Sequence, residues 1–212
     1  MRALTPLKLL VLLGLTATSN VALAQAGNND SVLNPNLADE SELAAAPGLN
    51  AEVAAIIIAA RPLASNLELD ALLGDSVDGA DKPRLRAVLF LPINLNSASE
   101  DEVKLVPGIS RKMVHEFDEY KPYSSLEQFR REIGKYVDKA EVARFEQYVF
   151  VPMDLNSASS DAFSTIPGMI RRMVHEFEEY RPYASIEQFR REIGKYVDEK
   201  EVARLERYIF IE

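Results

Sequence analysis

The chain has 212 residues, of which 47% are hydrophobic and 27% are charged, a mixture typical of a folded protein. Asp and Glu total 33 against 24 Lys and Arg, which gives a formal net charge of -9. A chain this acidic is repelled by phosphate backbones unless its basic groups gather on one face. The absence of Cys excludes disulfides and a cysteine-linked lipid anchor.

The N-terminus has the pattern of a signal peptide. Two basic residues flank the start of a short apolar run at residues 9–15, and small residues offer a cleavage site before Gln25. The run is too short to cross a bilayer, so we expect a removable signal peptide at residues 1–24, with an N-terminal membrane anchor as the alternative. Residues 25–32 are polar and predict a flexible lead-in. We therefore expect an exported protein, periplasmic or secreted, that has no membrane span after signal cleavage.

The rest of the chain repeats itself at a spacing of about 60 residues. Residues 127–138 recur unchanged as residues 187–198, and a more divergent copy precedes them. The repeat predicts three units, at residues 33–92 (the degenerate one), 93–152 and 153–212. The joints between units are apolar and contain proline, which predicts short extended segments that dock one unit on the next, with β-strands as the alternative.

The middle unit shows the helix signals most clearly. Ser99 begins a capping box and a first short helix, and Pro107-Gly108 ends that helix because Gly108 can take a positive φ. An apolar stripe predicts a second helix over residues 111–120. Further caps predict a third helix that closes at Gly134 and a fourth after Asp138. The fold class we expect is all-α, with three tandem repeats of two helical hairpins each.

Three motifs of the middle unit resemble a known family. Residues 94–98 (NLNSA), residues 106–109 (VPGI) and a helix ending at Lys121-Pro122 resemble the helix-hairpin-helix domain of the ComEA competence proteins. Residues 122–125 (PYSS), followed by a helix closed by glycine, also resemble PsbU, the photosystem II extrinsic subunit of the same fold. The resemblance extends over the chain after the lead-in, and it implies a fold that serves DNA binding in some proteins and protein docking in others.

For DNA-binding members, the resemblance implies that backbone N–H groups of the hairpin and the next helix N-terminus hold a phosphate without reading base sequence. The first hairpin glycine is present in all three units, but the second is replaced by Asn50, Ser110 and Ile170. Basic residues follow the hairpin in two units only. The candidate residues for binding DNA or a partner are Gly108, Ile109, Ser110, Arg111 and Lys112, and Gly168, Met169, Arg171 and Arg172.

Other charged residues of the second and third units have simpler interpretations. Arg130, Arg131 and their copies Arg190 and Arg191 alternate with glutamates, which predicts ion pairs on helix surfaces. We expect an acidic, solvated face on the second helix of each unit, formed by His115, Glu116, Asp118 and Glu119 and by His175, Glu176, Glu178 and Glu179.

No pattern in the sequence predicts an enzyme. The two histidines are repeat equivalents, His115 and His175, and neither belongs to a metal-binding spacing. Ile133-Gly134-Lys135 is a helix end and not a phosphate-binding loop. We therefore expect no catalytic residues, no metal, no cofactor and no small-molecule substrate.

Two binding functions remain. The first is protein docking within an envelope assembly of the competence or secretion type, because the second and third units offer equivalent surfaces rich in Tyr and Arg. The second is sequence-nonspecific binding of double-stranded DNA through the hairpins, as in DNA uptake by ComEA proteins. The acidic charge favours docking. The tyrosines concerned are Tyr120, Tyr123, Tyr136 and Tyr148 and their copies Tyr180, Tyr183, Tyr196 and Tyr208. Their alternative role is to cap the core.

Overall fold

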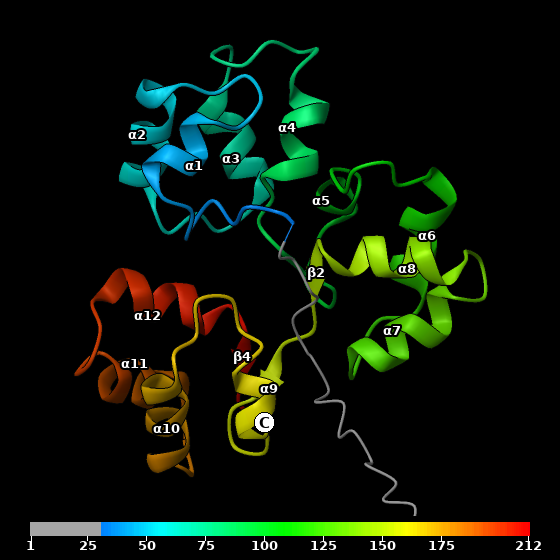
Figure 1. Ribbon diagram of the computed structural model, residues 1–212. Helices are drawn as coiled ribbons and strands as arrows, with labels where there is room; N and C mark the ends of the chain where they lie inside the picture. Colours follow the sequence, from blue (N-terminus) through cyan, green and yellow to red (C-terminus); the bar gives the residue numbers. More distant parts are fainter. Residues whose placement is uncertain (1–30) are drawn as a thin grey trace, which may run out of the picture.

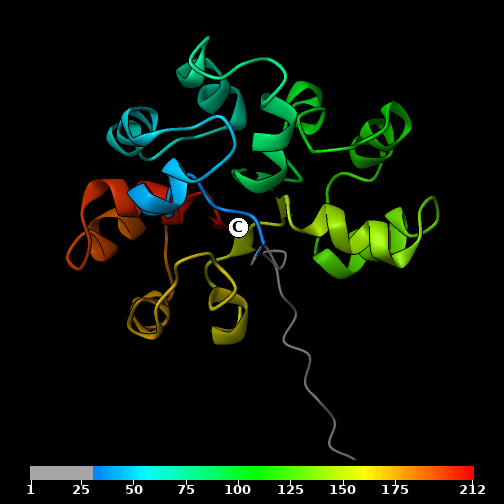
Figure 2. The same ribbon diagram turned by 45° about the horizontal axis from the view of Figure 1, so that its top comes forward.

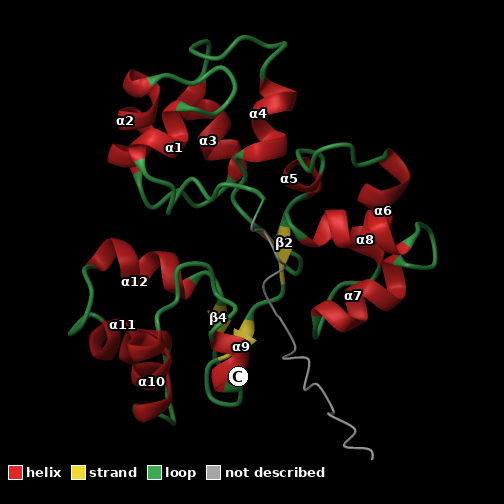
Figure 3. Ribbon diagram, viewed as in Figure 1, coloured by secondary structure: helices red, strands yellow, loops and turns green. Residues whose placement is uncertain are grey.

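The structure, a computed structural model, describes residues 31–212, so the predicted signal peptide lies outside the described part. The described chain forms three helical lobes in sequence order, blue to teal, green, and yellow to red in Figure 1. Helices dominate and strands are very short (Figure 3), which confirms the all-α expectation. In Figure 2 the lobes are arranged around the chain end marked C.

Each unit contributes four helices to residues 31–212. The first unit contains α1 (Glu40–Ala44), α2 (Ala51–Ala60), α3 (Asn66–Leu73) and α4 (Lys82–Val88). The second contains β1 (Ile93–Asn94), α5 (Glu100–Val103), α6 (Arg111–Glu119), α7 (Leu126–Ile133), α8 (Lys139–Glu146) and β2 (Val149–Phe150). The third contains β3 (Met153–Asp154), α9 (Ser160–Phe163), α10 (Arg171–Glu179), α11 (Ile186–Ile193), α12 (Glu199–Glu206) and β4 (Ile209–Phe210).

Side-chain caps start the helices where the sequence predicts them. Ser99 caps α5 by accepting from the backbone N–H of Glu102 at 3.2 Å, and Ser125 and Asp138 cap α7 and α8 in the same way. These bonds satisfy N–H groups that have no partner inside the helix. The end of α7 differs in detail from a left-handed cap, because Gly134 keeps a right-handed φ of -62°. A Cβ there would lie 2.6 Å from the Arg130 carbonyl oxygen, so close approach explains this glycine.

The recurring asparagine of each unit holds the chain after the second helix. Asn96 Nδ2 donates to the carbonyl of Tyr123 at 2.9 Å, and its Oδ1 accepts from the Tyr123 N–H at 2.6 Å. Asn36 and Asn156 bond the backbone of Leu63 and Tyr183 with the same pattern. The clamped residue follows a cis proline in every unit. The asparagine therefore acts as a backbone partner inside the fold and is not a ligand-binding group.

The basic residue before each cis proline joins the same clamp. Arg181 donates to the carbonyls of Leu155 and Ala158 at 2.7 and 2.6 Å, and Lys121 donates to the Ala98 carbonyl at 2.8 Å. The motifs that carry the family resemblance thus fasten the second helix of a unit to its opening segment.

The joints between units form short parallel strand pairs. β1 pairs with β2 in the register Ile93 to Val149, and β3 pairs with β4 in the register Met153 to Ile209. A single parallel bridge between Leu33 and Leu89 takes their place in the first unit. The strand alternative for the joints is therefore correct, and each pair ties the beginning of a unit to its end.

Each of the three units has its own apolar core, and each joint contributes a phenylalanine to the core of the next unit. Phe90 belongs to the core of the second unit and Phe150 to that of the third. The last two residues of the predicted flexible lead-in pack on the second unit, which corrects that prediction for them. Val32 is buried in the core of the second unit, and Ser31 Oγ donates to Gln147 at 2.9 Å.

Candidate binding site at the hairpin turns

The turn between the first two helices of each unit requires glycine. Gly48, Gly108 and Gly168 have φ values of 75°, 68° and 74°, a region that L-residues with a side chain adopt at a cost. The N–H groups of Ile109 and Met169 inside these turns donate to carbonyls of their own unit, at 3.1 and 2.9 Å. These two N–H groups are therefore already hydrogen-bonded within their own unit.

An arginine of the fourth helix supports the turn in two units. Arg144 Nη1 donates to the carbonyl of Pro107, and its other nitrogens bind Glu141 at 2.6 and 2.7 Å. This guanidinium lowers the pKa of the Glu141 carboxyl. Arg204 binds Pro167 and Glu201 in the same way and is almost fully buried. Both arginines are supports of the turn and have little capacity left for an external anion.

The second turn presents its predicted site residues at the start of α6. Ser110 Oγ caps the helix by accepting from the N–H of Met113 at 3.2 Å, and Ile109 packs at the edge of the core. Arg111 and Lys112 are exposed on the first turn of the helix. The structure thus brings Gly108, Ser110 and the basic pair together, with one helix N–H already bound by the serine.

The third turn has different surroundings. Ile170 stands at the cap position of α10, makes no side-chain cap and is 59% exposed. Leu37 of the first unit lies over Gly168, so that a Cβ on this glycine would be 3.0 Å from Leu37 Cδ2. Figure 1 shows this turn facing the first lobe. The Gly168 turn is therefore part of a contact between units, whereas Arg171 and Arg172 remain exposed.

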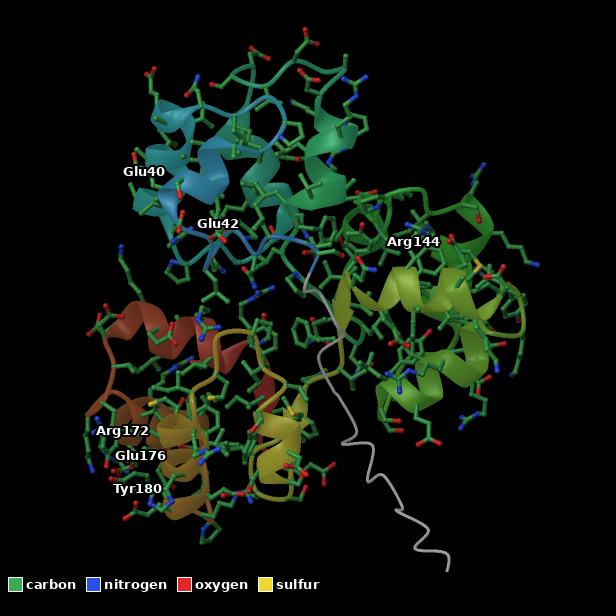
Figure 4. The ribbon with its side chains drawn as sticks, in the orientation of Figure 1. Glu40, Glu42, Arg144, Arg172, Glu176 and Tyr180 are labelled. Atoms are coloured by element: carbon green, nitrogen blue, oxygen red, sulfur yellow. The ribbon has the colours of Figure 1, made fainter. Side chains whose placement is uncertain are left out.

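A cluster of two tyrosines and two cations lies beside each of these turns, and we call it the cation–tyrosine cluster. In the second unit it consists of Lys112, Tyr120, Lys135 and Tyr136, and in the third unit of Arg172, Tyr180, Lys195 and Tyr196. Figure 4 labels Arg172, Glu176 and Tyr180, which follow one another along α10 and its C-cap residue. Lys112, Glu116 and Tyr120 form the equivalent stripe on α6.

The two clusters have nearly the same geometry. The tyrosine hydroxyls of each pair are 2.7 Å apart. Lys112 Nζ lies 4.7 Å from the ring centroid of Tyr136, and Arg172 Cζ lies 5.3 Å from that of Tyr196. Lys135 covers the other ring of the second unit at 5.0 Å, and its copy in the third unit does so at 4.9 Å. Each aromatic face is therefore paired with a cation of the same chain.

A buried carboxylate lies under each cluster, and this corrects the expected acidic face. Glu116 and Glu176 are only 8% and 7% exposed. Hydrogen bonds to Tyr120 and then to Glu116 raise the pKa of the Tyr136 hydroxyl. The other members of that face are exposed, apart from the half-buried Glu178. The sequence signal we missed is the spacing of four that aligns Lys112, Glu116 and Tyr120 on one side of the helix.

The first unit has no such cluster. The positions equivalent to Lys112, Tyr120, Lys135 and Tyr136 hold Glu52, Ala60, Asp75 and Ser76. Only the second and third of the three units therefore have a cation–tyrosine cluster. The degenerate first unit differs from them in its surface residues.

The other four tyrosines belong to the interior. Tyr123, Tyr148, Tyr183 and Tyr208 are buried, so the expectation that these rings cap the core is correct for half of the candidate tyrosines. The surface arginines also behave as expected. Arg130 and Arg131 bind Glu146 and Glu132 at 2.6 and 2.8 Å, and Arg190 and Arg191 bind the equivalent glutamates.

Both histidines, His115 and His175, are exposed on the second helix of their unit. His175 is exposed and its Nε2 lies 3.3 Å from Glu179 one turn later. Within residues 31–212 no group of three or more His, Asp or Glu side chains is arranged to hold a metal ion. The helices in this part of the chain also lack the combination of length and apolarity that a membrane span requires.

Neither a scan against protein-family models nor searches of curated proteins and of solved structures find a match to this chain. The resemblance to helix-hairpin-helix proteins therefore stays a prediction.

Proposed function

We propose that the protein is an exported, non-enzymatic docking module of tandem helix-hairpin-helix units, and that its partner is a protein of an envelope assembly. The observation that carries this proposal is the pair of cation–tyrosine clusters. Tyrosine and arginine are the side chains that most often anchor protein interfaces. In each cluster the rings and cations already hold one another in place, so binding costs little side-chain entropy.

Two equivalent clusters on one chain suit a partner with a repeated binding motif. Binding at the second cluster follows binding at the first without a new encounter, so two weak contacts give a strong combined one. The clusters lie in separate lobes, which lets one protein engage two neighbouring copies of a partner (Figure 1).

Several features favour a protein partner over double-stranded DNA. Lys112 lies over a tyrosine ring, and Arg172 lies over another ring with Glu176 3.9 Å away, so each of these exposed cations already has partners within the chain. Leu37 covers the Gly168 turn, and the net charge of -9 opposes approach to a polyanion.

An affinity capture tests the docking proposal. The bait is the protein from Gln25 onward, used against an envelope extract, beside the double variant Lys112→Ala with Arg172→Ala. A matched control replaces two exposed basic residues elsewhere, Arg84→Ala with Lys139→Ala. We expect the wild type and the control to retain the same protein and the cluster variant to lose it. Equal retention by all three baits would contradict the proposal.

A DNA titration tests the alternative. We expect no change in the fluorescence anisotropy of a labelled duplex at physiological salt with tens of micromolar protein, roughly the reach of nonspecific binding. Binding that disappears when Arg111, Lys112, Arg171 and Arg172 are replaced by Ala would make DNA the ligand instead.

A further inference from the structure

An aromatic contact joins each unit to the next one. The equivalent phenylalanine of the third unit has no such contact within residues 31–212. Phe90 meets Tyr148 of the second unit edge to face at 5.1 Å, and Phe150 meets Tyr208 of the third at 4.5 Å. Both phenylalanines are 1% exposed. The third phenylalanine of the series, Phe210, is 39% exposed and has no such ring partner among residues 31–212.

An arginine accompanies the tyrosine at the junction of the units. Arg207 Nη2 donates to the carbonyl of Pro92 at 3.2 Å, and its guanidinium carbon lies 5.8 Å from the ring centroid of Phe150. Burial lowers the pKa of the Arg207 guanidinium, and the charges of Glu102 and Glu68, from the other two units, partly oppose this shift. Arg207 lines a groove of about 260 Å³ between the first two units, together with Ala64, Asn94, Ser97, Ala98, Glu102 and Phe150.

The same groove recurs one unit later, and we call it the open groove because no arginine of residues 31–212 lines it. Its lining includes Ser124, Asp154, Ser157, Ala158, Ala162 and Phe210, each of them 60 positions after a lining residue of the first groove. Pro152, the counterpart of Pro92, also lines it. The volume is about 780 Å³ instead of about 260 Å³, and no arginine from residues 31–212 lines it.

The lining of the open groove has the charge that suits a cation. Asp154 stands where the first groove has the neutral Asn94, and Glu212 adds a second carboxylate. The Asp154 carboxylate is held in place by Ser157 Oγ, which donates to it at 2.6 Å. Carboxylates and an aromatic face together favour a guanidinium over a neutral side chain.

We propose that this open groove docks a partner polypeptide through an arginine followed directly by an aromatic residue, as Arg207 and Tyr208 dock on Phe150. The aromatic ring of the partner covers Phe210, and its guanidinium reaches the Pro152 carbonyl and Asp154. The chain cannot supply this pair from a second copy of itself in the folded state, because its own Arg207 and Tyr208 are engaged within the molecule. The groove shares no residue with the cation–tyrosine clusters, so either proposal can fail without the other.

The test uses a peptide as the probe. The acetylated and amidated peptide Leu-Glu-Arg-Tyr-Ile-Phe, the sequence of residues 205–210, is titrated into isotope-labelled protein and followed by amide chemical shifts. We expect saturable shifts around Phe210 and Ser157 at sub-millimolar to millimolar peptide, since a short free peptide must be ordered on binding. The variant Phe210→Ala should weaken binding at least tenfold, and Asp154→Asn should weaken it severalfold. A matched control, Leu67→Ala, changes another exposed apolar residue and should leave binding unchanged.

Three results would overturn the proposal. The first is no saturation at several millimolar peptide with folded protein, checked by circular dichroism. The second is equal binding of a peptide with glutamine in place of its arginine, because the guanidinium would then play no part. The third is a dimer in sedimentation that forms without peptide and disappears in Phe210→Ala, because a second copy of the chain would then be the occupant.

Discussion

The ring of Phe150 lies 4.5 Å from the ring of Tyr208, centroid to centroid, and this contact fastens the second unit to the third. Phe150 closes the strand pair of its own unit and fills the core of the next one. One side chain therefore serves two units, and the repeats are docked to one another and not strung on loose linkers.

This dual role predicts a large difference between two repeat-equivalent phenylalanines. Phe150→Ala should lower the free energy of unfolding by about 3–5 kcal/mol, the range for truncating a buried aromatic ring. Phe210→Ala should lower it by less than about 1 kcal/mol, because its ring is partly exposed. Urea unfolding followed by circular dichroism measures both. Similar losses of unfolding free energy in the two variants would show that the phenylalanine at the joint does not hold the units together.

Asn96 belongs to a motif that carries the family resemblance, and its clamp on the Tyr123 backbone predicts a structural role for that motif. Asn96→Ala removes both bonds to the Tyr123 backbone and should destabilise the protein by about 2–4 kcal/mol. Ser97→Ala, at the exposed neighbouring position, should change stability by no more than about 0.5 kcal/mol. Denaturant midpoints give the comparison, and a neutral Asn96→Ala would refute the clamp.

The hairpin glycines should respond unequally to alanine. Both variants strain a positive φ, at about 1–2 kcal/mol each. Gly168→Ala should cost more than Gly108→Ala, because its Cβ would lie 3.0 Å from Leu37 and not 3.5 Å from a flexible Arg144 nitrogen. In a Leu37→Ala background the excess should disappear. A double-mutant cycle on thermal unfolding measures this coupling, and strict additivity would mean that Leu37 does not cover the turn.

Acid should weaken a repeated ion cluster. Hydrogen bonds from Lys135 and then Arg131 lower the pKa of the Glu132 carboxyl, and Lys195 and Arg191 act similarly on Glu192. A carboxyl with a lowered folded-state pKa stabilises the fold above its unfolded pKa of about 4.3, and this contribution is lost as the pH falls through the folded value.

The stability difference between wild type and Glu132→Gln should therefore be present at pH 7 and shrink below about pH 4. Glu119→Gln, which removes a carboxylate at an exposed position, is the matched control. Urea midpoints at several pH values give the result. A difference that persists unchanged at pH 3 would mean that the charge of Glu132 does not matter.

Much of the fold was readable from local patterns. The period of about 60 residues, the serine and aspartate caps and the basic residue before each proline predict the ends of α6 and α7 to within a residue or two, whereas α5 ends at Val103, before the predicted stop at Pro107-Gly108. These features act over a few neighbouring residues, so a sequence shows them directly. The role of Asn96 was not readable, because its partner Tyr123 is distant in the chain and carries no complementary signal.

The proposed binding surfaces could be predicted only in part. Lys112, Glu116 and Tyr120 share a helix face, but their partner Tyr136 lies in a loop whose path depends on how the second and third helices pack. Contacts between units, such as Leu37 on Gly168 or Arg207 on Pro92, join residues more than 100 positions apart. They follow from the placement of whole lobes, which no local pattern encodes.

The most direct test of the docking function places a photo-reactive amino acid at single positions beside the clusters in the native envelope. Positions 111 and 171 begin α6 and α10, and position 51 begins α2 of the unit without a cluster. We expect the same protein adduct from positions 111 and 171 and none from position 51. Adducts with nucleic acid at 111 and 171, or equal protein adducts at all three positions, would contradict the account.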